Sequence, residues 1–249
     1  MAKRGAAKKW AKRLFLWLPL GFCLITIGQV LVLKWLDPIG SNFMFSRQLS
    51  AWASGDWQTR IDYRWRDLDA ISKSLPLALV AAEDQRFPDH HGFDFKAMEK
   101  AHRSNQRGRK VRGASTISQQ TAKNLFLWSG RSYVRKALEA WYTLWIELLW
   151  SKRRILEVYV NIVEYGDGVY GAEAAAQRFF GVKAKSLNTS QSARLAAVLP
   201  NPKKYNAKNP GPYVQRRSRA IERQMQALGG TGYLAECCWR SVGEIGKRR

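Results

Sequence analysis

The chain has 249 residues, 46% of them hydrophobic, and carries a formal net charge of +23 at pH 7. This composition excludes a disordered chain and is sufficient for one sizeable core or two small ones. The excess of positive charge suits an anionic partner, which could be nucleic acid, an anionic membrane surface or a phosphorylated ligand.

The first element is an uncharged run at residues 14–33, with the sequence LFLWLPLGFCLITIGQVLVL. As a helix it would cross a hydrocarbon core of roughly 30 Å. A cleaved signal peptide and a buried core helix are the alternatives. A signal peptide would be shorter and would end at a small-residue cleavage site, whereas Lys34 and Trp35 follow this run. We therefore predict an uncleaved transmembrane helix at residues 14–33.

The flanking charges predict the orientation of this span. Only Lys34 closely follows it, whereas the preceding basic N-terminus at residues 1–13 carries Lys3, Arg4, Lys8, Lys9, Lys12 and Arg13. Positive charge stays on the cytoplasmic side, so we expect a single-pass protein with its N-terminus in the cytoplasm and its remainder in the periplasm or exterior. Nucleic acid then becomes an unsuitable partner and anionic membrane lipids a suitable one. Cys23 and the adjacent Cys237 and Cys238 indicate no disulfide framework.

Residues 34–67 are predicted to form a connector or stalk. Its aromatic residues suit a lipid interface and suit core packing equally well. They are Trp35, Phe43, Phe45, Trp52 and Trp57.

Helical periodicity dominates from Leu68 onward. A helix with Pro76 in its first turn should run from Ser74 to Phe87, where Pro88 ends it. The strongest pattern, at residues 132–150, predicts a helix with one buried stripe at 4-3-4-3 spacing. The predicted stripe consists of Val134, Leu138, Trp141, Trp145 and Leu148. Further helices are predicted at 154–163, 171–180 and 190–199, followed by a basic, partly helical extension at 211–249.

Several short patterns resemble known sites without meeting their full requirements. Residues 166–171 match G-x-G-x-x-G, but the acidic residue that should follow about 20 positions later to bind a ribose is missing, so these glycines predict a tight turn. Asp67-x-Asp69 is too short to indicate a metal site, and the three histidines lack zinc-binding spacing. Ser115 stands in no nucleophile elbow. We expect no organic cofactor.

Two carboxylates are the candidates for chemistry. Glu83 and Asp84 lie near the end of their predicted helix, where the helix dipole and their mutual repulsion both favour the protonated form of a carboxyl. Glu83 is therefore a candidate proton acceptor near neutral pH. Simple ion pairing of Glu83 and Asp84 with Arg86 and other cations on a charged surface is an equally supported alternative.

The second carboxylate is Glu139, four residues after Arg135, at the spacing of an ordinary ion pair on a helix. Lys123, Asn124 and Lys136 lie nearby in the sequence, beside a polar loop at residues 113–120. Such a group can neutralise a pyrophosphate, while Glu139 orients a lysine or holds a divalent cation, Mg²⁺ or Mn²⁺, on the leaving group.

Four successive motifs carry a family resemblance. They are Glu83-Asp84-x-x-Phe87-x-x-His90-x-Gly92, Gly113-x-Ser115-Thr116-Ile117-x-Gln119-Gln120-x-x-Lys123-Asn124, Arg135-Lys136-x-x-Glu139 and Lys152-x-x-Ile155-Leu156-Glu157-x-Tyr159-x-Asn161. In this order and spacing they resemble the peptidoglycan glycosyltransferases of glycosyltransferase family 51, over a domain at residues 68–210. Since no transpeptidase domain follows, the chain is most similar to the monofunctional, membrane-anchored members.

The resemblance implies a mainly α, lysozyme-like glycosyltransferase domain with a smaller membrane-apposed lobe. It implies that lipid II is joined to the growing glycan strand by β-1,4 links, that undecaprenyl pyrophosphate is released, and that other cell-wall synthesis proteins are partners. Glu83 would be the general base and Glu139 would assist departure of the pyrophosphate. Lys123, Arg135 and Lys136 would bind donor phosphates. The two sugar sites would be shaped by Asp84, Ser115, Gln119, Gln120 and Asn124, while Glu157 and Asn161 would buttress the cleft.

Two other functions fit parts of the pattern. A membrane-anchored lytic glycosidase would use the same scaffold and an essential glutamate to cleave glycan, and a non-catalytic basic scaffold would hold partners by charge. The phosphate-binding cations and the predicted span favour the polymerase. The basic segment at residues 102–112 either grips lipid phosphates or is a solvated loop.

Overall fold

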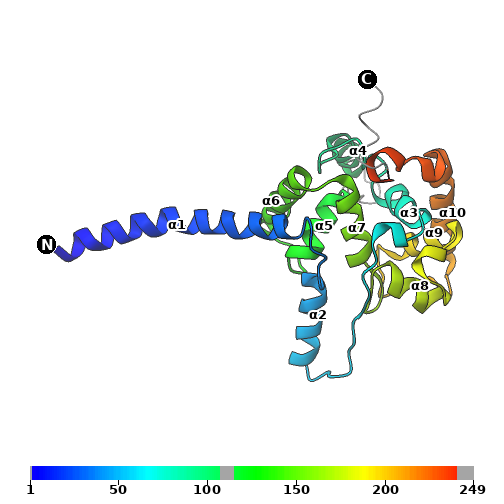
Figure 1. Cartoon of the computed structure of the whole chain (residues 1–249), viewed down its shortest axis with the longest axis horizontal. Coiled ribbons are helices and arrows are strands. Elements are labelled where there is room, and N and C mark those ends of the chain that lie inside the picture. The colour runs from blue at the N-terminus through cyan, green and yellow to red at the C-terminus, as the bar shows by residue number, and fades with distance from the viewer. Residues whose placement is uncertain (1, 107–114, 240–249) are drawn as a thin grey trace. The chain divides into compact units, whose positions relative to one another are not determined.

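The computed structural model describes the backbone of residues 2–106 and 115–239 (Figure 1). Within these ranges the side chains of residues 2–14, 16, 102, 105 and 106 are outside the description. Two predictions concern side chains outside this description. They fall on the basic N-terminus at residues 1–13 and on most of the basic segment at 102–112.

The chain divides into two compact units, Met1–Leu36 and Asp37–Arg249. The first unit contains helix α1 (Ala2–Val32), which includes almost all of the run at residues 14–33. Among the helices of the described residues, none combines the length and the apolar character needed to cross a membrane. The membrane crossing stays a prediction.

The second unit is mainly helical, as predicted. A small sheet with strand order β1-β3-β2 accompanies the helices, and in it β1 runs parallel and β2 antiparallel to β3. The strands are β1 (Asp62–Tyr63), β2 (Glu164–Gly166) and β3 (Val169–Tyr170). The α-helices are α2 (Asn42–Ala53), α3 (Ser74–Glu83), α4 (Phe95–Gln106), α5 (Ile117–Phe126), α6 (Tyr133–Leu149), α7 (Lys152–Ile162), α8 (Ala172–Phe180), α9 (Thr189–Val198) and α10 (Pro212–Ala227).

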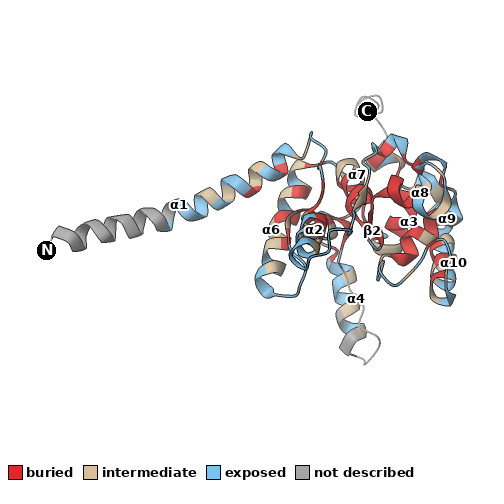
Figure 2. Cartoon of the chain, turned by 90° about the horizontal axis from the view of Figure 1, so that it is seen from below, coloured by how far each residue is buried: buried red, intermediate tan, exposed pale blue. Residues whose placement is uncertain are grey.

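Helix α3 is the centre of the core. Every residue from Leu75 to Ala81 is buried, so this helix has no solvent-facing side. It packs against α7, α9 and α10, and Figure 2 shows buried residues concentrated in α3 and its neighbours. Because α10 packs on α9 and α3, the start of the C-terminal extension at 211–249 belongs to the same compact unit.

The end of α3 differs from the prediction. The helix was expected to reach Phe87, but it ends at Glu83, and Asp84 leaves helical geometry at φ −157° and ψ 71°. The reason is tertiary: the Asp84 carboxylate turns inward and accepts hydrogen bonds from the His90 ring and from the backbone N–H of Ile117. Helix propensity alone favoured continuation to the proline, and these contacts override it.

The buried face of α6 also differs from the prediction. Val134 and Leu148 are 67% and 68% exposed, so the predicted stripe is not the buried one. The structure instead buries Glu139, Tyr142, Thr143 and Ile146, which lie on the side facing α5. Helix α6 carries apolar residues on both sides, and periodicity does not decide which side meets the protein. The helix itself is confirmed, with Ser132 as its N-cap.

The remaining helical predictions are confirmed to within two residues at each end, as α7, α8 and α9. The glycines at 166–171 lie at the β2–β3 turn and at the start of α8, as the tight-turn interpretation requires. Gly171 has φ 82° and ψ 160°, a region that is essentially restricted to glycine.

We predict that Gly171→Ala destabilises the fold by about 3 kcal/mol or more, because backbone strain adds to a steric clash. A Cβ at this position would lie 2.6 Å from the carbonyl oxygen of Asn161. Gly181→Ala is the matched control: Gly181 also has positive φ, at 67°, but open space surrounds its Cβ position. It should cost about 1 kcal/mol. Denaturant unfolding would measure both, and equal costs would contradict the proposed clash.

Candidate functional site

Glu83 is the last residue of α3, and its carboxylate is held by α5. The amide Nε2 of Gln120 donates to Glu83 Oε2 at 3.0 Å, and the Gln120 Oε1 accepts from the Tyr159 hydroxyl at 3.1 Å. Burial, with the charge of Glu83, raises the pKa of Tyr159 well above its ordinary value, so its hydroxyl stays a donor. Because the Tyr159 hydroxyl donates to the Gln120 amide oxygen, the Gln120 amide nitrogen is the atom that faces the Glu83 carboxylate.

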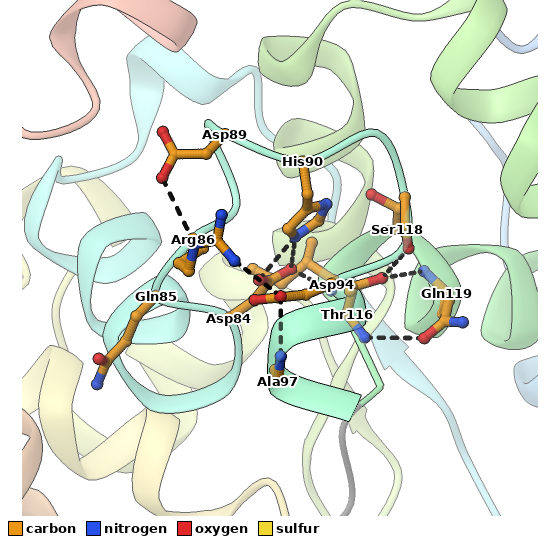
Figure 3. Close-up of polar contacts among 12 residues, drawn as sticks. Asp84, Gln85, Arg86, Asp89, His90, Asp94, Ala97, Thr116, Ser118 and Gln119 are labelled. Carbon is orange, nitrogen blue, oxygen red and sulfur yellow. Dashed lines mark hydrogen bonds and ion pairs between the residues drawn. The ribbon is translucent and has the colours of Figure 1, made fainter. Parts of the chain in front are cut away.

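Asp84 is buried and hydrogen-bonds residues of both the first and the second sequence motif. Its carboxylate accepts from His90 Nε2 at 2.8 and 3.0 Å and from the Ile117 backbone N–H at 2.9 Å. Figure 3 shows the Asp84 and His90 side chains facing each other beside Thr116. The Thr116 hydroxyl donates to the Gly92 carbonyl at 2.6 Å, and Thr116 and Gln119 cap α5 reciprocally. The start of α5 is thus fixed at several points.

The alternative in which Glu83 pairs with Arg86 is wrong. The Arg86 guanidinium binds Asp94 at 2.9 Å and approaches Asp89 at 4.0 Å. Glu83 instead lines a pocket of about 800 Å³. Its rim includes the exposed Ser115 and the α4 cations Lys96, Lys100 and Arg103. Glu83 therefore borders an open cleft whose lining carries these cations and also the carboxylates of Asp84, Asp94 and Glu99.

Glu139 has a different environment. It is 2% exposed, its Oε2 accepts from Arg135 Nη1 at 2.8 Å, and its Oε1 accepts from the Lys136 ammonium. This carboxylate is fully engaged by two cations. It is suited to holding those cations in place and not to accepting a proton.

Lys123 connects the two carboxylates. Burial is the main reason that the pKa of Lys123 is lowered, and the positive charges of Arg135 and Lys136 lower it further. The negative charges of Glu139 and Glu83 act in the opposite direction, Glu139 more strongly. The lysine ammonium also lies 5.7 Å from the centre of the Phe43 ring. Lys123 therefore interacts electrostatically with both halves of the predicted site, and the structure brings Glu83, Gln120, Lys123, Arg135, Lys136 and Glu139 together.

The other predicted site residues have varied surroundings. Ser115 and Asp84 line the cleft, and Asp84, Gln119 and Asn124 are buried. Glu157 accepts from the Leu68 backbone N–H at 2.9 Å and Asn161 from that of Arg66 at 3.0 Å, in keeping with a buttressing role. Sequence reasoning assigned no role to Tyr159, although the fourth motif contains it.

Known proteins with similar sequences decide the family. The family model described as transglycosylase matches residues 52–226, more than half of the chain. The chain belongs to the transglycosylase family. A "Biosynthetic peptidoglycan transglycosylase" of Xanthomonas axonopodis pv. citri (strain 306) is 57% identical over 235 residues, covering 93% of this chain and 96% of that protein. A protein of the same description from Xylella fastidiosa (strain M23) is 56% identical over 225 residues, 90% and 92% of the two chains. The resemblance drawn from the motifs is confirmed.

The divalent cation expected at Glu139 stays a prediction. Mg²⁺ and Mn²⁺ prefer several oxygen ligands. The part of the chain that the structure describes has no group of three or more His, Cys, Asp or Glu residues that could hold a metal. Glu139, the predicted ligand, already accepts from two cationic side chains.

We predict that Glu139→Gln lowers the free energy of unfolding by about 3 kcal/mol, because it leaves the Arg135 guanidinium, 11% exposed, without its charged partner. Lys136→Met is the control. Lys136 is 51% exposed, so its loss should cost less than about 1 kcal/mol. Denaturant unfolding of the two variants provides the comparison, and a smaller loss for Glu139→Gln than for Lys136→Met would contradict the predicted order.

Proposed function

We propose that this chain polymerises the glycan strands of peptidoglycan. It would join lipid II to the growing strand by a β-1,4 link and release undecaprenyl pyrophosphate. The observation that carries the proposal is that helix α5 links two carboxylates with different surroundings. Its Gln120 binds Glu83, and the charges of Glu139 and Glu83 both affect the pKa of its Lys123. Glu83 is open to a cleft, and Glu139 is locked within a cation cluster.

The acceptor half of the reaction belongs to Glu83. Its carboxylate takes the proton of the acceptor 4-hydroxyl as that oxygen forms a bond to the anomeric carbon of the donor, with inversion. The Gln120 amide holds one carboxylate oxygen at 3.0 Å, so the acid is oriented before substrate arrives. Among the described residues the other oxygen has no hydrogen-bond partner, and in this mechanism it receives the proton.

The leaving-group half belongs to the cation cluster. As the bond from the anomeric carbon to the phosphate oxygen breaks, its electron pair leaves with the pyrophosphate. Lys123, Arg135 and Lys136 place positive charge where that negative charge develops. Arg135 Nε is buried and has no hydrogen-bond partner among the described residues, and a pyrophosphate oxygen would supply one.

A location at the inner membrane completes the proposal, with the N-terminus in the cytoplasm and the catalytic unit in the periplasm. Helix α1 exposes large apolar side chains, among them Phe15 at 82% and Leu24 at 65%. In the second unit, the exposed apolar residues include Leu49 of α2 and Leu148 of α6, 65% and 68% exposed. Soluble surfaces rarely expose so much apolar area, and a substrate with a lipid tail requires contact with the bilayer. We therefore assign α2 and α6 to the membrane-apposed lobe.

A lytic glycosidase is less well supported by the same geometry. A glycosidase that uses two carboxyl groups needs both within reach of the scissile bond, and one that uses a single glutamate gains little from a phosphate-binding cation cluster. Here the second carboxylate is buried and saturated by cations. Supplying purified lipid II and finished glycan in separate reactions distinguishes the two activities. The polymerase consumes the first and leaves the second intact.

We predict that Glu83→Gln lowers the rate of lipid II polymerisation by at least about 100-fold, because glutamine cannot accept the proton. Glu99→Gln is the matched control, since Glu99 lines the same pocket but pairs with Arg103 on the exposed face of α4. It should stay within about threefold of the parent. Gel analysis of polymer formed from labelled lipid II measures both rates. Full activity of Glu83→Gln would refute the proposed mechanism and leave a non-catalytic scaffold as the better account.

We also predict that affinity for undecaprenyl pyrophosphate falls as pH rises through the lowered pKa of Lys123. The bound anion favours the charged lysine and raises its pKa, so binding takes up a proton between the pKa of the free protein and that of the complex. Calorimetric titration in detergent at several pH values measures this dependence. Lys123→Arg keeps its charge throughout and should remove the decline. An unchanged pH dependence in that variant would contradict the assignment.

A further inference from the structure

The turn that carries Glu83 is held from outside the family motifs. Glu83 is the end residue of α3, and two backbone carbonyls flank it closely, those of Ala82 and Gln85. Arg217 Nη2 donates to the Ala82 carbonyl at 2.9 Å, and the Tyr233 hydroxyl donates to the Gln85 carbonyl at 2.6 Å. These donors lie 135 and 148 residues further along the chain.

The end of a helix explains why such donors are needed. The last four carbonyls of an α-helix have no partner within the helix. In α3 the Val80 carbonyl receives the Asp84 N–H at 2.9 Å, and the Ala81 carbonyl receives Gln85 Nε2 at 3.1 Å. Arg217 takes the next carbonyl, and a cation at this end also opposes the negative pole of the helix dipole.

The C-terminal segment is placed to act as a rigid support. Helix α10, which carries Arg217, packs on α9 and α3, and the short helix η3 (Gly230–Gly232), which precedes Tyr233, contacts both α10 and α3. Burial raises the pKa of Tyr233, so its hydroxyl remains a donor at neutral pH. Neither residue is among those that line the pocket beside Glu83.

We propose that Arg217 and Tyr233 are positioning residues, which grip the peptide carbonyls on either side of Glu83 and so fix where its carboxylate enters the cleft. The inference rests on the proposed role of Glu83 as general base. A misplacement of about 1 Å at a reacting group can cost about 100-fold in rate. Loss of the grip should therefore lower kcat and leave substrate binding, which other elements provide, nearly unchanged.

The test uses the full chain in detergent, with kcat and KM for lipid II measured over a range of pH. Arg217→Met and Tyr233→Phe should each lower kcat by about tenfold and the double variant by about 100-fold, with KM within about twofold of the parent. Arg217→Lys should recover most of kcat, because an ammonium can still donate to the carbonyl. Arg216→Met and Tyr213→Phe are matched controls. Arg216 is the exposed neighbour on α10, and Tyr213 stacks on Tyr205.

Each contrary outcome has a defined meaning. Parent-like kcat in the double variant, with Glu83→Gln inactive, overturns the positioning role and leaves the proposed function standing. An active Glu83→Gln variant overturns the proposed function itself. A loss of kcat that matches the loss of folded protein seen by circular dichroism, or that the two controls share, also overturns the positioning role. Tyr233→Phe removes a single oxygen atom, so it decides the matter where Arg217→Met does not fold.

Discussion

The buried carboxylate of Asp84 is the interaction on which the site depends. A buried carboxylate is costly unless hydrogen bonds replace its water. Here the donors are the ring of His90 and the backbone N–H of Ile117. Satisfying Asp84 therefore draws the residues after α3 and the start of α5 to one point. Because Asp84 directly follows Glu83, this tie ends α3 at Glu83 and places that carboxylate within reach of Gln120, on the first turn of α5.

Helix α5 then relates the two halves of the reaction to each other. Gln120 and Lys123 are three residues apart and share one face of the helix. The first binds Glu83, and the second is buried close enough to Glu139, Arg135 and Lys136 for their charges to affect its pKa. These three cations and the single buried carboxylate of Glu139 leave the cluster with an excess of positive charge. Under the proposed function, a bound pyrophosphate would balance this excess of positive charge.

The sequence was informative wherever the causes were local. Hydrophobic periodicity located α6 and α7 to within about two residues at each end, and the motifs identified which side chains gather at the site. The end of α3 could not be predicted, because the contacts of Asp84 that end it come from His90 and Ile117. The buried face of α6 could not be predicted either, because Val134 and Leu148 are as apolar as a core residue. Arg217 and Tyr233 show no spacing or motif that relates them to Glu83, since only the folded chain brings them together.

The contrast between the two glutamates follows from how each is compensated. Glu83 sits at the negative end of α3, where its charge is least favoured, and among the described residues no cation lies within ion-pairing distance of it. A neutral amide, that of Gln120, orients it instead. Glu139 is paired directly with Arg135 and Lys136, and a proton would have to displace these cations. In the proposed mechanism, two carboxylates whose surroundings differ in this way would divide the work of acid–base chemistry and charge stabilisation, although they are the same residue type.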